Sequence, residues 1–152
     1  MIGCTTTDKA TITATNGSAG GFAGYTRRDN SSHTNTRVWI VGCASQSTVV
    51  GDKAGSMIGN SVKNNGEWGA CLTASYAVTN ATSYIGTGSG DAQVIAAYNY
   101  TSATDATQED IDAMNAAIVE FNNSPDNIYV DGEIGAVMLK RWALVNGVPV
   151  LQ

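Results

Sequence analysis

Charge, proline and histidine are all scarce in this chain, and their scarcity narrows the possible functions. Of its 152 residues, 14% are charged, two are proline and one, His33, is histidine. The net charge of −5 argues against nucleic acid or an anionic membrane as the main partner, because both require clustered Lys and Arg. The basic pairs Arg27–Arg28 and Lys140–Arg141 are therefore interpreted as solvated charges.

The sequence also lacks a segment that would direct it into a membrane. No apolar run approaches the roughly 20 residues that span a bilayer, so membrane insertion is not expected. Residues Met1 to Thr5 show neither the basic region nor the apolar stretch of a signal peptide, and strand-like sequence begins almost at once. We therefore expect the chain to be a fragment of a larger protein.

Glycine, threonine, serine, asparagine and alanine are plentiful, and this mixture is typical of short strands joined by tight turns. Three segments align within it. Each has a small residue before a cysteine, an alternating strand, a turn, and a large apolar residue two positions before a glycine. The aligned parts are Ile2–Thr7 with Gly20–Tyr25, Val41–Gln46 with Gly55–Asn60, and Gly69–Ala74 with Thr82–Thr87.

This repeat predicts a mainly β fold, a short parallel β-solenoid (β-helix) of about three coils. A single unit cannot bury its apolar face alone, but stacked units can. We expect Phe22, Met57 and Tyr84 to stack on successive coils about 4.8 Å apart. The glycines that follow them should mark corners that need a positive φ or a close backbone approach; these are Gly24, Gly59 and Gly86.

The three cysteines, Cys4, Cys43 and Cys71, occupy equivalent positions in the aligned units. They predict an inward-facing column of buried free thiols, which behave as small hydrophobic side chains. Stacked side chains that point the same way have poor disulfide geometry. One disulfide or a metal site are the alternatives, although no Cys-x-x-Cys or His-x-x-x-His spacing supports zinc.

The last third of the chain differs in character. Residues 92–100 are interpreted as a last, degenerate coil. Residues 108–122 are predicted to form a helix, because Thr107 can cap it and Glu109 and Asp110 suit the positive end of its dipole. One apolar stripe runs along this helix: Ile111, Met114, Ile118 and Phe121. We expect the stripe to cover the open end of the solenoid, whose core and strand edges would otherwise be exposed.

After the helix, the sequence predicts short strands and a hairpin. Ile128–Val130 and Ile134–Met138 are interpreted as strands around a turn at Asp131–Gly132. Asn146–Gly147 between apolar runs is a strong hairpin signal, and Pro149 predicts an edge strand. The predicted organisation is residues 1–100 for the solenoid repeats and residues 101–152 for a cap made of a helix and a hairpin.

The repeat resembles the GLUG repeat of bacterial surface proteins. Residues 20–24, with the sequence Gly-Gly-Phe-Ala-Gly, and Cys43–Val49 match that pattern, and Ala70–Val78 with Tyr84–Gly86 matches it more loosely. The second and third units lack the double glycine. The resemblance implies a parallel β-helix in a secreted or surface-attached protein. Some such proteins are adhesin-like, and others are attached to proteases whose chemistry lies outside the repeats.

No catalytic residue, cofactor site or metal site is predicted. His33 is expected to be an exposed loop residue, because no Gly-x-Ser-x-Gly elbow accompanies it. Gly86–Gly90 lacks the Lys of a phosphate-binding loop and is interpreted as a corner. Capping explains the carboxylates at the helix start better than paired-carboxylate glycosidase chemistry does; they are Asp105, Glu109, Asp110 and Asp112. A solvent-facing strand explains the threonine row better than an ice-binding array does; it comprises Thr11, Thr13 and Thr15.

These features favour a non-enzymatic structural or adhesion module of a bacterial extracellular or cell-surface protein. Host or bacterial surface proteins and glycans are the expected partners, and the ligand-binding residues are unknown from sequence. Aromatic residues suit such contacts or core positions equally; they are Tyr25, Trp39, Trp68, Tyr98 and Tyr100. The alternative is a carbohydrate-binding or polysaccharide-processing β-helix fragment, although a processing enzyme needs a long groove and clustered charges that this short chain does not favour.

Overall fold

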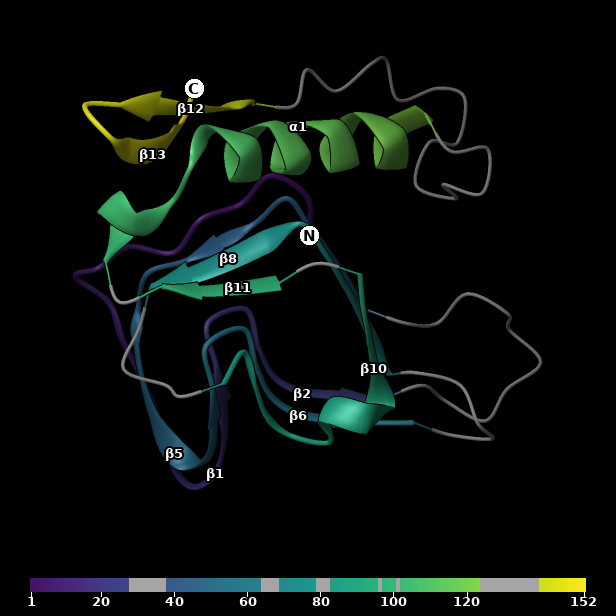
Figure 1. Cartoon of the computed structure of the whole chain (residues 1–152). Coiled ribbons are helices and arrows are strands. Elements are labelled where there is room, and N and C mark those ends of the chain that lie inside the picture. Colours follow the sequence, from purple (N-terminus) through teal and green to yellow (C-terminus); the bar gives the residue numbers. More distant parts are fainter. Residues whose placement is uncertain (28–37, 64–68, 79–82, 96, 101, 124–139) are drawn as a thin grey trace, which may run out of the picture.

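A computed structural model describes residues 1–27, 38–63, 69–78, 83–95, 97–100, 102–123 and 140–152. Most of these residues form short strands that wind into a parallel β-solenoid, which is followed by one helix and an antiparallel hairpin. Figure 1 looks along the stacked coils, so that β1 (Thr11–Gly20) and β5 (Thr48–Gly55) lie almost one behind the other. The predicted fold class is confirmed.

Equivalent strands of successive coils pair in parallel and form one sheet for each side of the coil. Besides β1 with β5, the sheets are β3 (Val38–Val41), β7 (Ala70–Thr73) and β10 (Ala92–Val94); β4 (Ala44–Ser45), β8 (Ser75–Val78) and β11 (Ala97–Tyr100); and β2 (Ala23–Arg27), β6 (Ile58–Val62) and β9 (Ile85–Thr87). Bridges from Ile2 to Val41 and from Thr5 to Ala44 extend the first coil. The predicted last coil at residues 92–100 is confirmed, because β10 and β11 pair with β7 and β8.

The large apolar residues at the predicted stacking positions lie in one column. The Phe22 N–H donates to the Met57 carbonyl oxygen at 3.0 Å, and the Met57 N–H donates to the Tyr84 carbonyl oxygen at 3.0 Å. Met57 in the middle is fully buried, whereas Phe22 and Tyr84 are partly exposed. Stacking therefore buries a side chain best where coils lie on both sides of it.

The glycines two positions after these residues are needed for close packing. A Cβ atom on Gly59 would lie 2.6 Å from the Ala19 backbone nitrogen, which leaves no room for a side chain. Their predicted close approach is thus confirmed, but none of them has a positive φ. The left-handed conformation occurs at another corner of the coil, where three equivalent residues have φ of 53°, 56° and 42°; they are Gly3, Gly42 and Ala74.

The predicted column of buried cysteines is wrong for Cys71, which lies outside the column, and for Cys4, which is in the column but exposed because no described coil covers it on its outer side. Cys4 and Cys43 stack, since the Ala44 N–H donates to the Cys4 carbonyl oxygen at 2.9 Å. Cys71, however, pairs with Trp39. The residue that lies next to Cys43 on the third coil is Ser75, whose Oγ accepts a hydrogen bond of 3.1 Å from the Cys43 N–H.

The core and the left-handed corner set this register. Leu72 pairs with Ile40, and both are fully buried in the interior of the coils. Ala74 then takes the corner that Gly42 takes in the coil below. Since successive side chains on a strand point to opposite faces, Cys71 lies on the face of β7 opposite Leu72, whereas Cys43 belongs to the interior core.

Helix α1 (Gln108–Asn123) confirms the predicted helix and its cap. The Thr107 Oγ1 accepts a hydrogen bond from the Asp110 N–H at 3.2 Å, and the Asp110 carboxylate accepts one from the Thr107 N–H at 2.8 Å. This reciprocal pair is a capping box with Asp in place of the usual Glu. In the predicted stripe, Ile111, Met114 and Ile118 are buried and Phe121 is half-buried.

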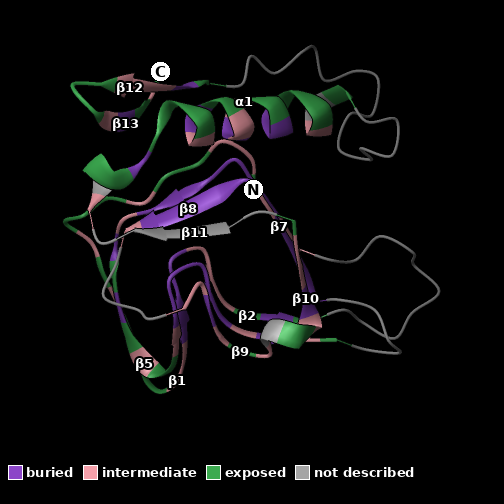
Figure 2. Cartoon of the chain, viewed as in Figure 1, coloured by how far each residue is buried: buried purple, intermediate pink, exposed green. Residues whose placement is uncertain are grey.

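The helix lies along one side of the coils, not across an end, and this corrects the expected end cap (Figures 1 and 2). Its stripe packs against Val41, Ala44 and Tyr76, which belong to a second cluster separate from the interior core. The strands β3, β7 and β8 carry apolar side chains on both faces. The apolar outward face of these strands must therefore be shielded from water, just as the open end of a solenoid must be.

The C-terminal strands β12 (Trp142–Val145) and β13 (Val148–Leu151) form the predicted hairpin. Asn146 and Gly147 have φ of 54° and 77°, as a type I′ turn requires. Among the described strands, β13 pairs with β12 alone, so the predicted edge position of Pro149 is confirmed. The strands predicted within residues 128–138 lie outside the described residues.

Candidate binding surface

The aromatic residues singled out from the sequence have different environments. Trp39 is half-buried beside α1, where its ring centroid lies 5.7 Å from that of Phe121. Tyr25 on β2 is 53% exposed. Of the described aromatic candidates, Tyr25 is thus the one available to a partner. His33 and Trp68, and the side chains of Tyr98 and Tyr100, lie outside what the structure describes.

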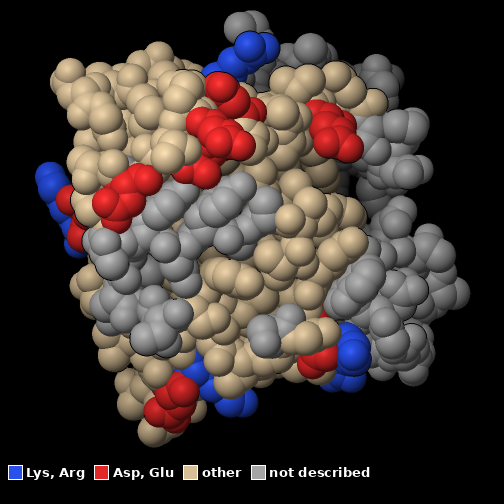
Figure 3. Space-filling model, in the orientation of Figure 1, with Lys and Arg blue, Asp and Glu red and all other residues tan. Residues whose placement is uncertain are grey.

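The carboxylates near the start of α1 serve the local backbone and side chains. The Asp105 carboxylate accepts a hydrogen bond from the Ser102 N–H at 2.9 Å, and Asp112 accepts one from Gln108 Nε2 at 2.8 Å. Asp110 completes the capping box. Figure 3 shows acidic side chains gathered over this side of the molecule, where α1 lies in Figure 1. Capping and solvation account for the group.

Two further sequence candidates have structural roles. Gly88 has a φ of 71°, and a Cβ atom there would collide with the Ser61 carbonyl oxygen, so the glycine-rich segment is a corner. The exposed Thr11 pairs with Thr48, but Thr13 pairs with Val50. The threonine row of β1 is therefore not repeated on the neighbouring coil.

One side of the solenoid carries a row of polar and aromatic side chains, in which Tyr25 and Thr87 are exposed and Asn60 between them is half-buried. Tyr25 on β2 pairs with Asn60 on β6, and Asn60 pairs with Thr87 on β9. Thr87 Oγ1 donates a hydrogen bond of 2.8 Å to Asn60 Oδ1. The next residues along β2 and β6, Thr26 and Ser61, pair with each other and are buried, which places the row on the opposite, outer side of the strands. We call Tyr25, Asn60 and Thr87 the outer row.

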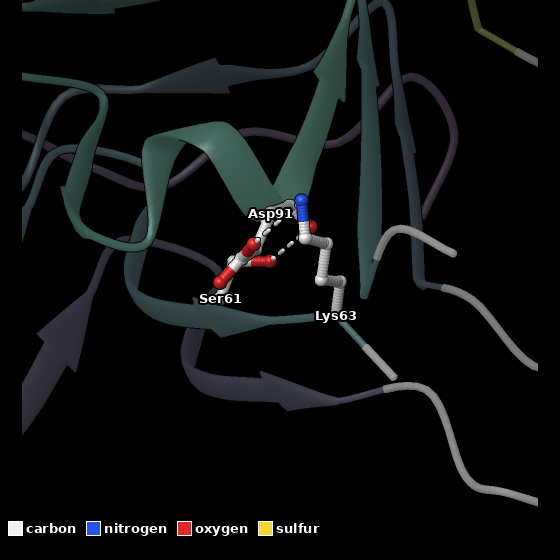
Figure 4. A network of polar contacts seen from close by, with 3 residues as sticks. All are labelled: Ser61, Lys63 and Asp91. Carbon is white, nitrogen blue, oxygen red and sulfur yellow. Dashed lines mark hydrogen bonds and ion pairs between the residues drawn. The ribbon is translucent and has the colours of Figure 1, made fainter. Parts of the chain in front are cut away.

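Charged side chains adjoin this row. Arg27 is exposed and pairs with Val62, two residues beyond Asn60. Lys63 Nζ lies 3.6 Å from Asp91 Oδ1, and Figure 4 shows this pair beside Ser61, whose Oγ donates to the Asp91 backbone oxygen at 3.2 Å. Both charged side chains are partly exposed, so solvent screens the pair and it adds little stability. The pair lies just beyond the end of β6, beside the buried Ser61.

The perturbed pKa values belong to packing groups. Burial raises the pKa of Tyr76 to about 12, against a smaller lowering by the hydrogen bond with Gln46. Burial likewise raises the pKa of Cys43 to about 11. Both groups keep their proton at neutral pH, so neither is an activated acid, base or nucleophile there. Within the described part of the chain, no three His, Cys, Asp or Glu side chains are grouped so as to hold a metal ion.

No protein-family model, curated protein or solved structure matches this chain. Among the helices that the structure describes, none has the length and apolar character needed to cross a membrane.

Two of the three residues of the outer row were not predicted from the sequence. Asn60 and Thr87 are unremarkable polar residues until strand pairing places them beside Tyr25. A signal was nevertheless present, because each member of the row lies three positions after a residue of the Phe22, Met57 and Tyr84 column. A search of positions at a constant offset from the stacking residues would have found the row.

Proposed function

We propose that the chain is a non-enzymatic structural or adhesion module of a bacterial extracellular or cell-surface protein, and that the outer row is part of its contact surface. One observation carries the proposal: the register that sets Tyr25, Asn60 and Thr87 side by side on β2, β6 and β9.

A paired sheet suits the presentation of a contact surface. Neighbouring strands are held about 4.8 Å apart by backbone hydrogen bonds, so side chains on them are positioned before a partner arrives. Tyr25 offers a large and rigid ring with a polar tip, which is the kind of side chain enriched in contact surfaces. The amide of Asn60 and the hydroxyl of Thr87 add a donor and acceptor set beside it.

The chemistry of this surface favours a polar partner of low charge. Among the described residues, Arg27 lies on the same strand as Tyr25 and the Lys63–Asp91 pair lies beyond the end of β6, and the chain as a whole carries −5. A glycan or a polar protein surface fits an aromatic ring flanked by an amide and a hydroxyl. A polyanion does not fit, because it requires a cluster of cations.

The location outside the cell rests on the resemblance to GLUG-repeat proteins and on the parallel solenoid that this resemblance implies. The competing hypothesis is a carbohydrate-binding or polysaccharide-processing fragment. Binding without turnover is a special case of the main proposal, whereas processing is a different function.

A glycan array with parallel detection of released products tests the proposal. The chain and its Tyr25→Ala variant are compared with Val50→Ala, which removes a similarly exposed side chain from β5 and serves as the matched control. We expect the Tyr25→Ala change to weaken binding at least tenfold, because it removes the ring, and the Val50→Ala change to leave binding unaltered.

Three results would count against the proposal in different ways. Product release would assign the chain to the processing enzymes. Binding that withstands Tyr25→Ala would move the contact surface away from the outer row. If no glycan binds, the same variants are compared for attachment to bacterial and host cell surfaces, and an absence of attachment there leaves the adhesive role unsupported.

A further inference from the structure

Cys4 and Cys43 lie at equivalent positions of the first and second coils and are not part of the outer row. We propose that Cys4 and Cys43 form a reversible disulfide that staples the first coil to the second under oxidising conditions.

The backbone already holds the two residues in register. The Ile2–Val41 and Thr5–Ala44 bridges flank them on either side. Adjacent strands lie about 4.8 Å apart, which falls within the roughly 4.4–6.8 Å separation of Cα atoms across a disulfide. Of the three cysteines, these two alone are neighbours in one column, because Cys71 pairs with Trp39 on the second coil.

The two side chains start from equivalent backbone conformations. Stacked cysteines that point the same way have poor disulfide geometry, so closure requires a side-chain rotation that brings the two sulfur atoms together. Each cysteine follows a glycine in the left-handed conformation, Gly3 with a φ of 53° and Gly42 with a φ of 56°. Each Sγ donates a hydrogen bond of 3.3 Å to the carbonyl oxygen two residues earlier. Closing the disulfide requires one side chain to rotate away from this carbonyl. Cys4 is exposed whereas Cys43 is fully buried, so Cys4 is the side chain expected to rotate.

This difference in exposure sets the order of the chemistry. A small disulfide such as oxidised glutathione is the oxidant. The Cys4 thiolate attacks one of its sulfur atoms, which forms a mixed disulfide and releases one glutathione thiol. Burial raises the pKa of Cys43 to about 11, so few Cys43 thiols are ionised at any moment and this second step is the slow one. The Cys43 thiolate, formed when the thiol loses its proton to solvent, attacks the Cys4 sulfur, and the second glutathione leaves as a thiolate that takes up a proton. Two protein thiols are oxidised and one glutathione disulfide is reduced to two thiols.

The disulfide joins the first coil covalently to its neighbour. The outer edge of the first coil has no strand paired to it among the described residues, so this coil relies on its contacts with the second coil. A cross-link that closes the chain from Cys4 to Cys43 reduces the freedom of the unfolded state. We expect the midpoint of thermal unfolding to rise by about 5 °C on oxidation.

Intact mass after alkylation under denaturing conditions tests the proposal. The folded chain is incubated with oxidised glutathione, and remaining thiols are then alkylated in denaturant. We expect one alkylated cysteine in the wild-type chain, together with a mass loss of two hydrogens and no bound glutathione. The Cys71→Ser variant is the matched control: it should form the same disulfide and leave no cysteine to alkylate.

Cys4→Ser and Cys43→Ser should both abolish the mass loss. If Cys43→Ser does not fold, proteolytic mapping of the oxidised wild-type chain still decides the matter, because it identifies the joined peptides directly. A cross-linked peptide with Cys4 and Cys43 supports the proposal. A glutathione adduct that persists on Cys4, three unmodified thiols, or a cross-link that includes Cys71 overturns it.

Discussion

The indole N–H of Trp142 donates a hydrogen bond of 2.7 Å to the backbone carbonyl oxygen of Gly42, 100 positions earlier in the chain. The Trp142 ring is buried and stands edge-on to Tyr76, with centroids 5.9 Å apart. Asn115 on α1 holds the backbone of the same residue, since its Oδ1 accepts from the Trp142 N–H at 2.8 Å and its Nδ2 donates to the Trp142 oxygen at 2.9 Å. Trp142 therefore joins the hairpin, the helix and the solenoid.

Replacing Trp142 should lower the stability of the fold, because the hairpin, the helix and the solenoid lose their common contact. Trp142→Phe keeps an aromatic ring but removes the N–H, and we expect a loss of about 1–3 kcal/mol of stability because a buried polar partner is left without its bond. Trp142→Ala also empties the site, and the expected loss is about 3–5 kcal/mol. Urea unfolding followed by circular dichroism measures both. Val145→Ala, at a 40% exposed position of the same strand, is the control and should change stability little. If Trp142→Phe lowers stability no more than Val145→Ala does, the proposed role of the hydrogen bond is contradicted.

Gly42 should tolerate no side chain, for two separable reasons. Its φ is 56°, and a Cβ atom there would lie 2.5 Å from Ile118 Cγ1 and 2.9 Å from the Met114 carbonyl oxygen on α1. Gly147 has a φ of 77° but nothing within 4 Å of such an atom. Gly147→Ala therefore isolates the conformational cost, about 1–2 kcal/mol, and Gly42→Ala should cost about 1–3 kcal/mol more through the clash with α1. Denaturant midpoints of the two variants provide the comparison, and equal values would show that α1 does not press on this corner.

The capping box of α1 predicts a smaller effect. Thr107→Ala removes the acceptor of the Asp110 N–H and should destabilise the chain by about 1 kcal/mol. Thr107→Ser retains a hydroxyl and should remain close to the wild type. Thermal unfolding followed by far-UV circular dichroism distinguishes the stabilities of the two variants. A Ser variant as unstable as the Ala variant would mean that the methyl group, not the hydroxyl, is the stabilising feature.

Alkaline pH should destabilise the fold through its buried acids. Burial raises the pKa of Cys43 from its ordinary 9.0 to about 11 and that of Tyr76 from 10.0 to about 12. The folded state thus holds both protons more tightly than the unfolded chain does. Their stabilising contribution is complete below the ordinary pKa values and is lost as the pH rises through the raised ones.

Unfolding free energies measured between about pH 8 and 12 test this expectation. Tyr76→Phe should flatten the alkaline decline, because the variant has no phenol to ionise at this buried site. Tyr25→Phe is the matched control, since Tyr25 is 53% exposed. An alkaline decline that is unchanged in Tyr76→Phe would show that other groups control base unfolding.

Much of the fold was predictable because local patterns and global packing agree. The alternating strands, the spacing of Phe22, Met57 and Tyr84, the cap at Thr107 and the Asn146–Gly147 turn each have one favourable local structure. The position of Cys71 was not predictable in this way. Cys71 was aligned with Cys43 because each follows a small residue. The actual register depends instead on pairing Leu72 with Ile40 and on bringing Ala74 into the left-handed corner.

The candidate surface was less predictable than the fold. Tyr25 was identified as an aromatic candidate, but its partners Asn60 and Thr87 acquire significance only beside it. Solvent-facing positions carry a weak pattern in a sequence, because many residue types satisfy them equally well. Strand pairing converts such scattered positions into one row.

By itself the sequence determined that the chain forms stacked parallel coils followed by a helix and a hairpin, because periodicity, turn residues and caps act over a few neighbouring residues. Only the tertiary structure decided which coil positions meet and where the helix lies. Both depend on which faces remain apolar once the coils have formed: Val41, Ala44 and Tyr76 leave an apolar outer side, and α1 and Trp142 cover that side rather than an open end.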